Sequence, residues 1–276
     1  KMYGKVNQKL ISDNGGFIVL PPYPQFPNLD IPDVYTPDTA QLHDIGTKFE
    51  YGGRVWHYSR AAAAVGGNLA VKPYNHQDVG YSVAAATSAI GATDISVTTD
   101  ANDNLAGVAA KDELKGGTVV IFEKTLGVGY EQIRGITGND ALAAYGTLKI
   151  YLDAPLTQAF TVAVGYAEAT ASPWAKVAHY GSTVLNGGVC SACGIPACYA
   201  TSGQWLWVQT WGPCWVSPSA TAGVGDNNRG VWFSGDGSIT DQDASLGNLG
   251  SYAGWVIAND HASTQGAPFV YLQIAR

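Results

Sequence analysis

The amino-acid sequence predicts an all-β protein, an antiparallel β-sandwich or β-barrel built from many short strands, with little helix. Three observations predict this class. Only 13% of the 276 residues are charged and 46% are hydrophobic, and 34 glycines divide the chain into short segments. Runs rich in β-branched and aromatic residues recur between these breaks. The alanine-rich stretches at 60–67 and 82–92 are cut by glycine before three turns of apolar stripe are complete, so they predict single turns only.

The first 45 residues differ from the rest, and we expect them to form an extended, proline-rich N-terminal arm. Six of the 13 prolines lie within residues 21–37, and proline disfavours helix and sheet pairing while favouring polyproline-like backbone. A solvated linker is one interpretation of this composition. The interleaved large apolar side chains favour an arm that packs along its own domain or a neighbouring subunit. The residues expected at that contact are Tyr23, Phe26, Ile31 and Tyr35.

Residues 46–276 are expected to form a β-rich body, which can also be divided into two β subdomains, 46–170 and 171–276. Its first element is a hairpin in TKFEYGGRVWHYS, because Gly52 and Gly53 suit the positive φ angles of a tight two-residue turn. The strands expected next lie at 68–72, 95–99, 117–123, 130–137, 147–153, 160–167 and 175–180. The last three are expected at 230–234, 253–259 and 268–275.

The segment GQWLWVQTWGPCWV, residues 203–216, predicts a central strand. Alternation gives this strand two faces, one with Trp205, Trp207, Gln209 and Trp211 and the other with Leu206, Val208 and Thr210. Neither face is polar, so we expect the strand to be buried on both sides or covered by a partner. We expect it to end at a turn formed by Gly212 and Pro213. Trp205, Trp207 and Trp211 are predicted to fill the core or a subunit contact.

Four cysteines lie close together in the sequence. Cys190, Cys193 and Cys198 form a C-x2-C-x4-C pattern, and Cys214 follows sixteen residues later. Two thiolates separated by two residues can chelate zinc, and four sulfurs would complete a tetrahedral shell, although the second close pair of a zinc ribbon is missing. Three interpretations stay open: free or partly paired thiols in a packed loop, one or two disulfides, and a zinc site. We expect no bound metal or other cofactor.

The chain shows no recognisable catalytic motif, and we expect it to be non-enzymatic, with no catalytic residues. Its five histidines stand outside catalytic signatures, and it has no G-x-S-x-G elbow, P-loop or H-E-x-x-H pair. A net charge of −7, without a cluster of Lys or Arg, argues against a nucleic-acid partner. No apolar run reaches 18 residues, so no membrane partner is expected. Eight tryptophans and 15 tyrosines leave sugar binding open as an alternative.

Five phrases of the sequence carry a family resemblance. In order along residues 45–276 they are IGTKFEYGGRVWHYSRAAAAVGGNLAVKP, GGTVVIFEKTLGVGYEQIRGI, GTLKIYLDAPL, WLWVQTWGPCWV and AGWVIANDHASTQGAPFVYLQI. Their order resembles that of a group of tailed-bacteriophage virion structural proteins, in which a G-T-x-(F/Y)-x-Y-x-G-(R/K)-x-(F/Y/W)-x-Y phrase precedes a β-rich middle and a Q-T-W-G-P-C strand. The cysteine loop and the proline-rich arm depart from that pattern.

The resemblance implies an auxiliary capsid protein of the decoration, or cement, kind. Such a protein would lie on the outer surface of the capsid in the virion. Its partners would be the major capsid protein and neighbouring copies of itself, with a dimer or trimer as the expected homo-oligomer. The alternative is a tail or baseplate-associated receptor-binding or glycan-binding protein, for which the tryptophans would supply the ligand platform.

Overall fold

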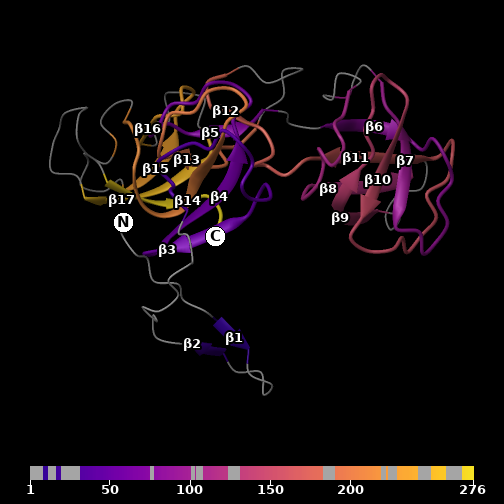
Figure 1. Cartoon of the computed structure of the whole chain (residues 1–276), viewed down its shortest axis with the longest axis horizontal. Helices are drawn as coiled ribbons and strands as arrows, with labels where there is room; N and C mark the ends of the chain where they lie inside the picture. The colour runs from indigo at the N-terminus through magenta and orange to yellow at the C-terminus, as the bar shows by residue number, and fades with distance from the viewer. Residues whose placement is uncertain are drawn as a thin grey trace.

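The structure, a computed structural model, describes residues 9–11, 17–19, 32–74, 78–100, 103, 108–123, 131–182, 190–218, 222, 229–241, 250–258 and 269–276. Every helix or strand element in these residues is a β-strand, so the predicted all-β class is confirmed. Figure 1 shows most strands gathered in two bodies, a barrel formed by described residues within 78–170 and a sheet body formed by described residues within 32–74 and 171–276, while the β1–β2 pair lies apart from both. In the described part of the chain, no helix is long and apolar enough to cross a membrane.

The barrel consists of six antiparallel strands. They are β6 (Val79–Val83), β7 (Asp94–Thr98), β8 (Thr118–Glu123), β9 (Gln132–Asn139), β10 (Thr147–Leu152) and β11 (Gly165–Thr170). Their order is β6-β11-β8-β9-β10-β7, and an antiparallel bridge between Ala84 and Val97 links the two outer strands. Alternate residues of β8 and β10 are buried, so each strand turns one face inward. The interior is filled by side chains such as Ile95, Leu148 and Phe160.

The sheet body is built on a larger sheet with the order β16-β15-β17-β18-β14-β4-β3, and β13 pairs with β14. Its strands are β3 (Lys48–Tyr51), β4 (Arg54–Arg60), β13 (Ile195–Pro196), β14 (Trp205–Trp215), β15 (Gly230–Phe233), β16 (Ile239–Thr240), β17 (Tyr252–Ala258) and β18 (Phe269–Gln273). A separate pair joins β5 (Val71–Pro73) to β12 (Val177–His179). The predicted hairpin is confirmed as β3 and β4, with φ angles of 60° at Gly52 and 77° at Gly53.

Strand pairing divides the chain differently from the sequence division into 46–170 and 171–276. Strand β4 pairs with β14, and β5 pairs with β12, so residues 48–73 share their sheets with the C-terminal part of the chain. The barrel is an insertion between these two halves. Strand β4 has β3 on one edge, and its other edge is paired by β14 from the C-terminal part of the chain.

The central tryptophan strand, β14, is buried on two sides as predicted. Trp207 packs in one core cluster with Trp56 and Tyr58, while Leu206 and Val208 belong to another. The predicted end at Gly212–Pro213 is wrong, because β14 continues to Trp215 by pairing with β18. On the other side, β4 pairs only as far as Trp211, so the missing N–H of proline costs no ladder bond there. Gly212, with φ 90°, fits against the Gly53 carbonyl.

Two further segments differ from the sequence prediction. Residues 79–83 form β6, although part of this stretch was expected to make a single helical turn. Alanine is small enough for a crowded barrel interior, and Ala84, Ala167 and Ala169 are buried there. Strand β11 begins at Gly165 and not at 160, because the chain turns at Ala163, whose φ is 75°.

The described parts of the N-terminal arm are two short strands and residues 32–45. Strands β1 (Lys9–Ile11) and β2 (Phe17–Val19) pair with each other as an antiparallel hairpin. Residues 20–31, including Tyr23, Phe26 and Ile31, lie outside the described residues.

Candidate interaction surface

Residues 32–45 pack against the sheet body of their own chain. Val34 is buried in the cluster formed around Trp56, Tyr58 and Trp207. The Asp38 amide donates a hydrogen bond of 2.7 Å to the Trp205 carbonyl, and the Trp205 amide returns one of 3.0 Å. The Tyr58 hydroxyl donates to Asp38 Oδ2 at 2.7 Å. Burial is the largest cause that raises the pKa of Tyr58, so this hydroxyl keeps its proton and remains a donor.

Near the end of β4, aromatic side chains point outward from four neighbouring strands, alongside a few other exposed residues such as Pro213 and Ile257. We call the aromatic residues the aromatic face: Trp211, Trp232, Tyr252, Trp255, Phe269 and Tyr271. They come from β14, β15, β17 and β18, which are consecutive in the sheet. The residues between them, such as Val231, Val256 and Val270, fill the core on the other side. The two-residue period of the strands therefore turns the aromatic rings outward.

The rings of the aromatic face contact one another across the strands. Trp255 lies beside Tyr271 with ring centroids 5.3 Å apart and planes inclined by 7°. Trp211 meets Tyr271 edge-on, at 5.9 Å and 87°, and its indole Nε1 donates to the Tyr271 hydroxyl at 3.2 Å. The Arg276 guanidinium lies 5.7 Å from the centroid of the Trp211 ring. These contacts hold the rings in fixed orientations before any ligand arrives.

Glycine at two positions allows this packing. The Trp232 ring lies over Gly230, where a Cβ atom would approach it to 2.9 Å, and Gly230 pairs with Trp255 on the next strand. Gly254 has a φ of 146° and fits against the Tyr271 carbonyl, where an L side chain is strained. The two glycines thus place Trp232 and Trp255 on the same surface.

The aromatic face is open to solvent. Tyr252 is 43% exposed, Trp255 is 40% exposed and Phe269 is 54% exposed. Large rings that are exposed together, with hydroxyl and indole N–H groups at their edges, are typical of surfaces that bind proteins or sugars. This is the surface of the described chain that we treat as the candidate functional site.

The structure separates the interface residues that the sequence predicted. Trp207 is 2% exposed and belongs to the core of its own chain. Trp205 is half-buried beside that core, where the Arg60 guanidinium lies 5.4 Å from its ring centroid. Trp211 belongs to the aromatic face. Tyr35 is exposed, and its hydroxyl accepts a hydrogen bond of 3.2 Å from Arg54.

Five residues of the aromatic face were not among the predicted sites: Trp232, Tyr252, Trp255, Phe269 and Tyr271. A signal was present, because the predicted strands at 230–234, 253–259 and 268–275 each carry at least one aromatic residue. Periodicity alone does not say which face of a strand meets the core. The pairing shift between Gln209 and Trp211 also interrupts the alternation along β14, so the position of Trp211 does not follow from that of Trp207.

The four cysteines are free thiols. Cys193 is buried with Leu206 and Val208, and Cys198 packs against the same cluster, whereas Cys214 packs against a different one. Burial is the main cause that raises the pKa of Cys198 to about 11 and that of Cys214 to about 12. Reactive cysteines have a lowered pKa, so these thiols lack that activation. Among the described residues, no three His, Cys, Asp or Glu side chains gather as a metal site.

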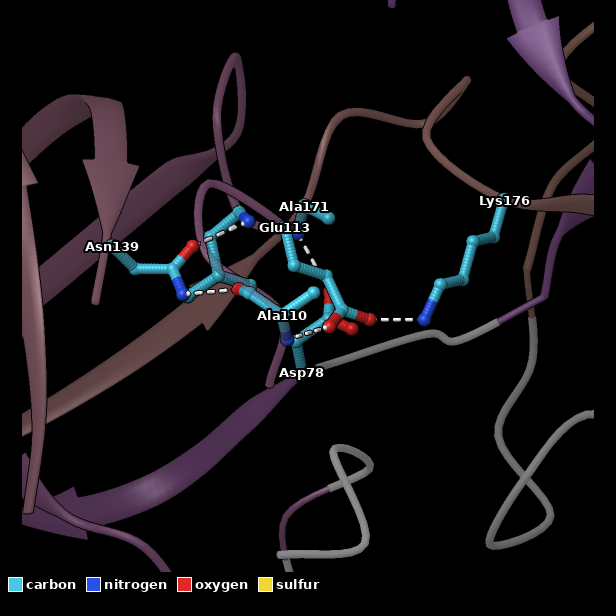
Figure 2. Close-up of polar contacts among 7 residues, drawn as sticks. Asp78, Ala110, Glu113, Asn139, Ala171 and Lys176 are labelled. Atoms are coloured by element: carbon cyan, nitrogen blue, oxygen red, sulfur yellow. Dashed lines mark hydrogen bonds and ion pairs between the residues drawn. The ribbon is translucent and has the colours of Figure 1, made fainter. Parts of the chain in front are cut away.

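A polar junction joins the barrel to the sheet body (Figure 2). Glu113, on a turn of the barrel, forms an ion pair with Lys176 and also accepts a hydrogen bond of 2.7 Å from the Ala110 amide. Asp78 is buried and accepts a hydrogen bond of 2.6 Å from the Ala171 amide, so it connects the two chain segments that enter and leave the barrel. The Glu113–Lys176 ion pair and the Asp78–Ala171 hydrogen bond connect the two bodies, and the Ala110 bond positions Glu113 for its ion pair.

A cleft of about 690 Å³ lies beside this junction. Its walls carry both signs of charge, with Arg60, Lys111 and Lys115 near Asp44 and Asp112. Lys115 Nζ reaches Asp44 Oδ2 at 3.5 Å, which is a second ion pair between the bodies. The described residues that line the cleft include no histidine, cysteine or serine. The cleft therefore offers an ionic contact between the bodies, and the aromatic face remains the stronger candidate for a binding surface.

Comparison with known protein families, curated proteins and solved structures finds no match to this chain.

Proposed function

We propose that the chain is a non-enzymatic structural protein of a phage virion, which binds and stabilises the outer surface of the capsid shell as a decoration protein. Its partners are the major capsid protein and neighbouring copies of itself. The observation that carries the proposal is the aromatic face, whose rings are exposed to solvent and pack against one another on the surface of the sheet. The resemblance of five sequence phrases to virion structural proteins supports the assignment to a capsid.

The energetics of the aromatic face suit a protein contact. Trp255 is 40% exposed and Phe269 is 54% exposed, so a partner that covers them still removes much of each ring from water. An aromatic side chain buries 150–250 Å², so covering the remainder removes about 100 Å² and contributes about 2 kcal/mol per ring. Aromatic residues are enriched at the energetic centres of interfaces. A decoration protein uses such contact area and needs no enclosed pocket.

A glycan-binding protein of the tail or baseplate is the second candidate. The observation that favours it is the Trp255 ring, which is exposed and lies nearly parallel to Tyr271. An exposed indole ring offers an apolar surface on which the C–H face of a sugar can lie.

Sedimentation with capsid shells tests the proposal. Shells of the phage that encodes the chain, stripped of this protein, are mixed with purified wild type, and the bound protein is measured in the pellet as the concentration rises. We expect saturable binding with a fixed number of copies per shell, weaker binding of Trp255→Ala, and wild-type binding of Tyr145→Ala. Tyr145 is the matched control, because it is 52% exposed on the barrel.

Two results would overturn the proposal in favour of the second candidate. One is the absence of wild-type binding to the shells. The other is binding of the wild type to immobilised glycans that disappears in Trp255→Ala and persists in Tyr145→Ala.

A further inference from the structure

The proline-rich segment has a three-residue period that the strand analysis leaves unexplained. From residue 20 the sequence reads LPPYPQFPNLDIP. Every third position from the start is apolar: Leu20, Tyr23, Phe26, Leu29 and Pro32. The next register carries Pro21, Pro24 and Pro27, followed by Asp30. A polyproline II helix has three residues per turn, so this sequence gives such a helix one edge of large apolar side chains and one edge of prolines.

We infer that this segment, residues 20–32, docks on the aromatic face of a second copy of the chain. The inference rests on the proposed function, because it specifies which partner, a neighbouring copy of the chain, covers the aromatic face. Polyproline segments bind to surfaces lined by aromatic rings, because their rigid backbone loses little entropy and their free carbonyls accept hydrogen bonds from the edges of the rings. The aromatic face supplies the rings. The Trp211 indole N–H already donates to the Tyr271 hydroxyl, which leaves that hydroxyl to donate to a carbonyl of the segment.

The spacing of the rings is on the scale of the segment's repeat. Trp211 on β14 and Trp255 on β17 flank Tyr271 on β18, so two strand spacings, about 10 Å, separate the two tryptophans across the sheet. Trp211 pairs with Gln273 whereas Trp255 pairs with Tyr271, so Trp211 is also displaced by two residues, about 7 Å, along the strands. A polyproline II helix rises about 3.1 Å per residue, so its three-residue repeat is about 9 Å. Consecutive turns of the segment can therefore approach the two tryptophans when the segment crosses the strands obliquely.

Charge agrees with this placement. Asp30 is the single charged residue of the segment from Leu20 to Pro32. Arg276 lies beside Trp211 at one end of the aromatic face, with its guanidinium 5.7 Å from the ring centroid. An Asp30 carboxylate at the end of the proline edge would meet a cation there, and the rest of the segment would meet uncharged rings.

The path of the chain before the sheet body shows where the arm begins. Asp38 pairs with Trp205, at the start of β14. The Tyr35 hydroxyl contacts Arg54. Arg54 precedes Val55, which pairs with Trp211 further along β14. From residue 38 back to residue 35 the chain therefore runs along β14 toward the end that carries Trp211. The described part of the arm thus reaches, through the Tyr35 side chain, the end of the sheet body where the aromatic face begins.

The arm is long enough to reach the aromatic face of a second copy. The twelve residues between Val19 and Pro32 span about 37 Å as a polyproline II helix, and the four strands of the aromatic face are about 14 Å wide, so the segment can cross the whole face with length to spare. The arm then ends in strands β1 and β2, which pair only with each other in the described pairing. A two-stranded hairpin is marginally stable alone and needs another surface. A two-fold arrangement lets each copy donate one arm and receive one.

A complementation experiment with full-length chains tests the inference. The arm variant carries Tyr23→Ser and Phe26→Ser, the face variant carries Trp255→Ala, and a third chain carries all three changes. Masses are measured by light scattering across a concentration series, and differently tagged chains are mixed at equal amounts for affinity capture. The control is Tyr145→Ala, whose exposed tyrosine lies on the barrel.

We expect the wild type and the control to form a dimer, and the arm and face variants to dissociate at least tenfold more readily when each is alone. Mixed together, the two variants should capture each other, because one retains the face and the other retains the arm. The chain with all three changes should capture neither. A monomeric wild type, a face variant that dimerises as the wild type does, or a failure of the two variants to capture each other would overturn the inference.

A peptide measurement guards against a variant that loses its fold. A synthetic peptide of residues 19–33 is titrated into each chain while the tryptophan emission is followed, with a scrambled peptide as the control. We expect the peptide to bind the arm variant and to bind Trp255→Ala or Tyr252→Ala at least tenfold more weakly. Equal binding of the scrambled peptide would contradict docking by this sequence. Because neither experiment uses capsid shells, both can fail while shell binding stands.

Discussion

Replacing Trp207 by alanine tests whether β14 forms the two-sided centre of the sheet body. Trp207 is 2% exposed, and its ring centroid lies 5.0 Å from that of Tyr58, 5.2 Å from His43 and 5.8 Å from Phe49. Truncating a buried tryptophan removes its transfer free energy and leaves a cavity, which together cost about 3–5 kcal/mol. The cavity here would be bounded by rings fixed on β3 and β4, so little collapse can offset this loss. We expect the free energy of unfolding to fall by about 4 kcal/mol.

The assay is urea denaturation followed by far-ultraviolet circular dichroism, because tryptophan emission itself changes in the variant. The matched control is Trp255→Ala, which removes the same side chain from the same sheet at a position that is 40% exposed. That change is expected to cost about 1 kcal/mol or less. A loss below about 1 kcal/mol for Trp207→Ala, or an equal loss for both variants, would refute the assignment of Trp207 to the core and Trp255 to the surface.

Four further predictions concern stability and cysteine chemistry. Burial is the largest cause that lowers the pKa of His57 from 6.5, so the unfolded chain binds a proton at this residue more readily than the folded chain. The melting temperature should therefore fall as the pH drops below about 6.5. The fall should be smaller in His57→Phe, which keeps a ring stacked against Trp174. Gly212→Ala should lower the free energy of unfolding by at least about 2 kcal/mol in urea titration, because φ is 90° and a Cβ would press on the Gly53 carbonyl. A double-mutant cycle with Glu113→Gln and Lys176→Met should give a coupling of about 1 kcal/mol that weakens in high salt. All four cysteines should react with a thiol reagent in denaturant without reductant, and slowly in the native protein.

Each of these predictions has a contradictory result. A melting temperature of His57→Phe that falls with acidity as much as that of the wild type would remove His57 as the cause. Wild-type stability of Gly212→Ala would mean that β14 turns differently at this position. A coupling of zero between Glu113 and Lys176 would leave the junction to other contacts. Fewer than four reactive thiols in denaturant would bring back the disulfide or metal interpretations.

Local signals in the sequence predicted most of the strands, but not β1, β2, β6, β13 or β16. Gly52 and Gly53 predicted the β3–β4 hairpin because a tight two-residue turn needs two positive φ angles, and the structure has them. The apolar alternation of residues 205–208 predicted a strand buried on both sides for the same kind of local reason. Pro213 misled the prediction, because whether a proline ends a strand depends on whether a neighbouring strand needs its N–H there.

Long-range pairing could not be predicted in this way. Nothing local in residues 54–60 specifies β14 as their neighbour, so the insertion of the barrel into the sheet body follows only from the assembled fold. The aromatic face illustrates the same limit. Trp211, Trp255 and Tyr271 are far apart in sequence, and they meet because β14, β18 and β17 lie side by side in register. Their strands were predicted, but their shared surface depends on that register.

Imaging of intact virions labelled with an antibody against this chain tests the central proposal most directly. The proposal predicts label distributed over the outer surface of the head, in a number that repeats from particle to particle. Label confined to the tail or baseplate, or found only after the head is opened, would contradict a decoration protein of the outer capsid surface.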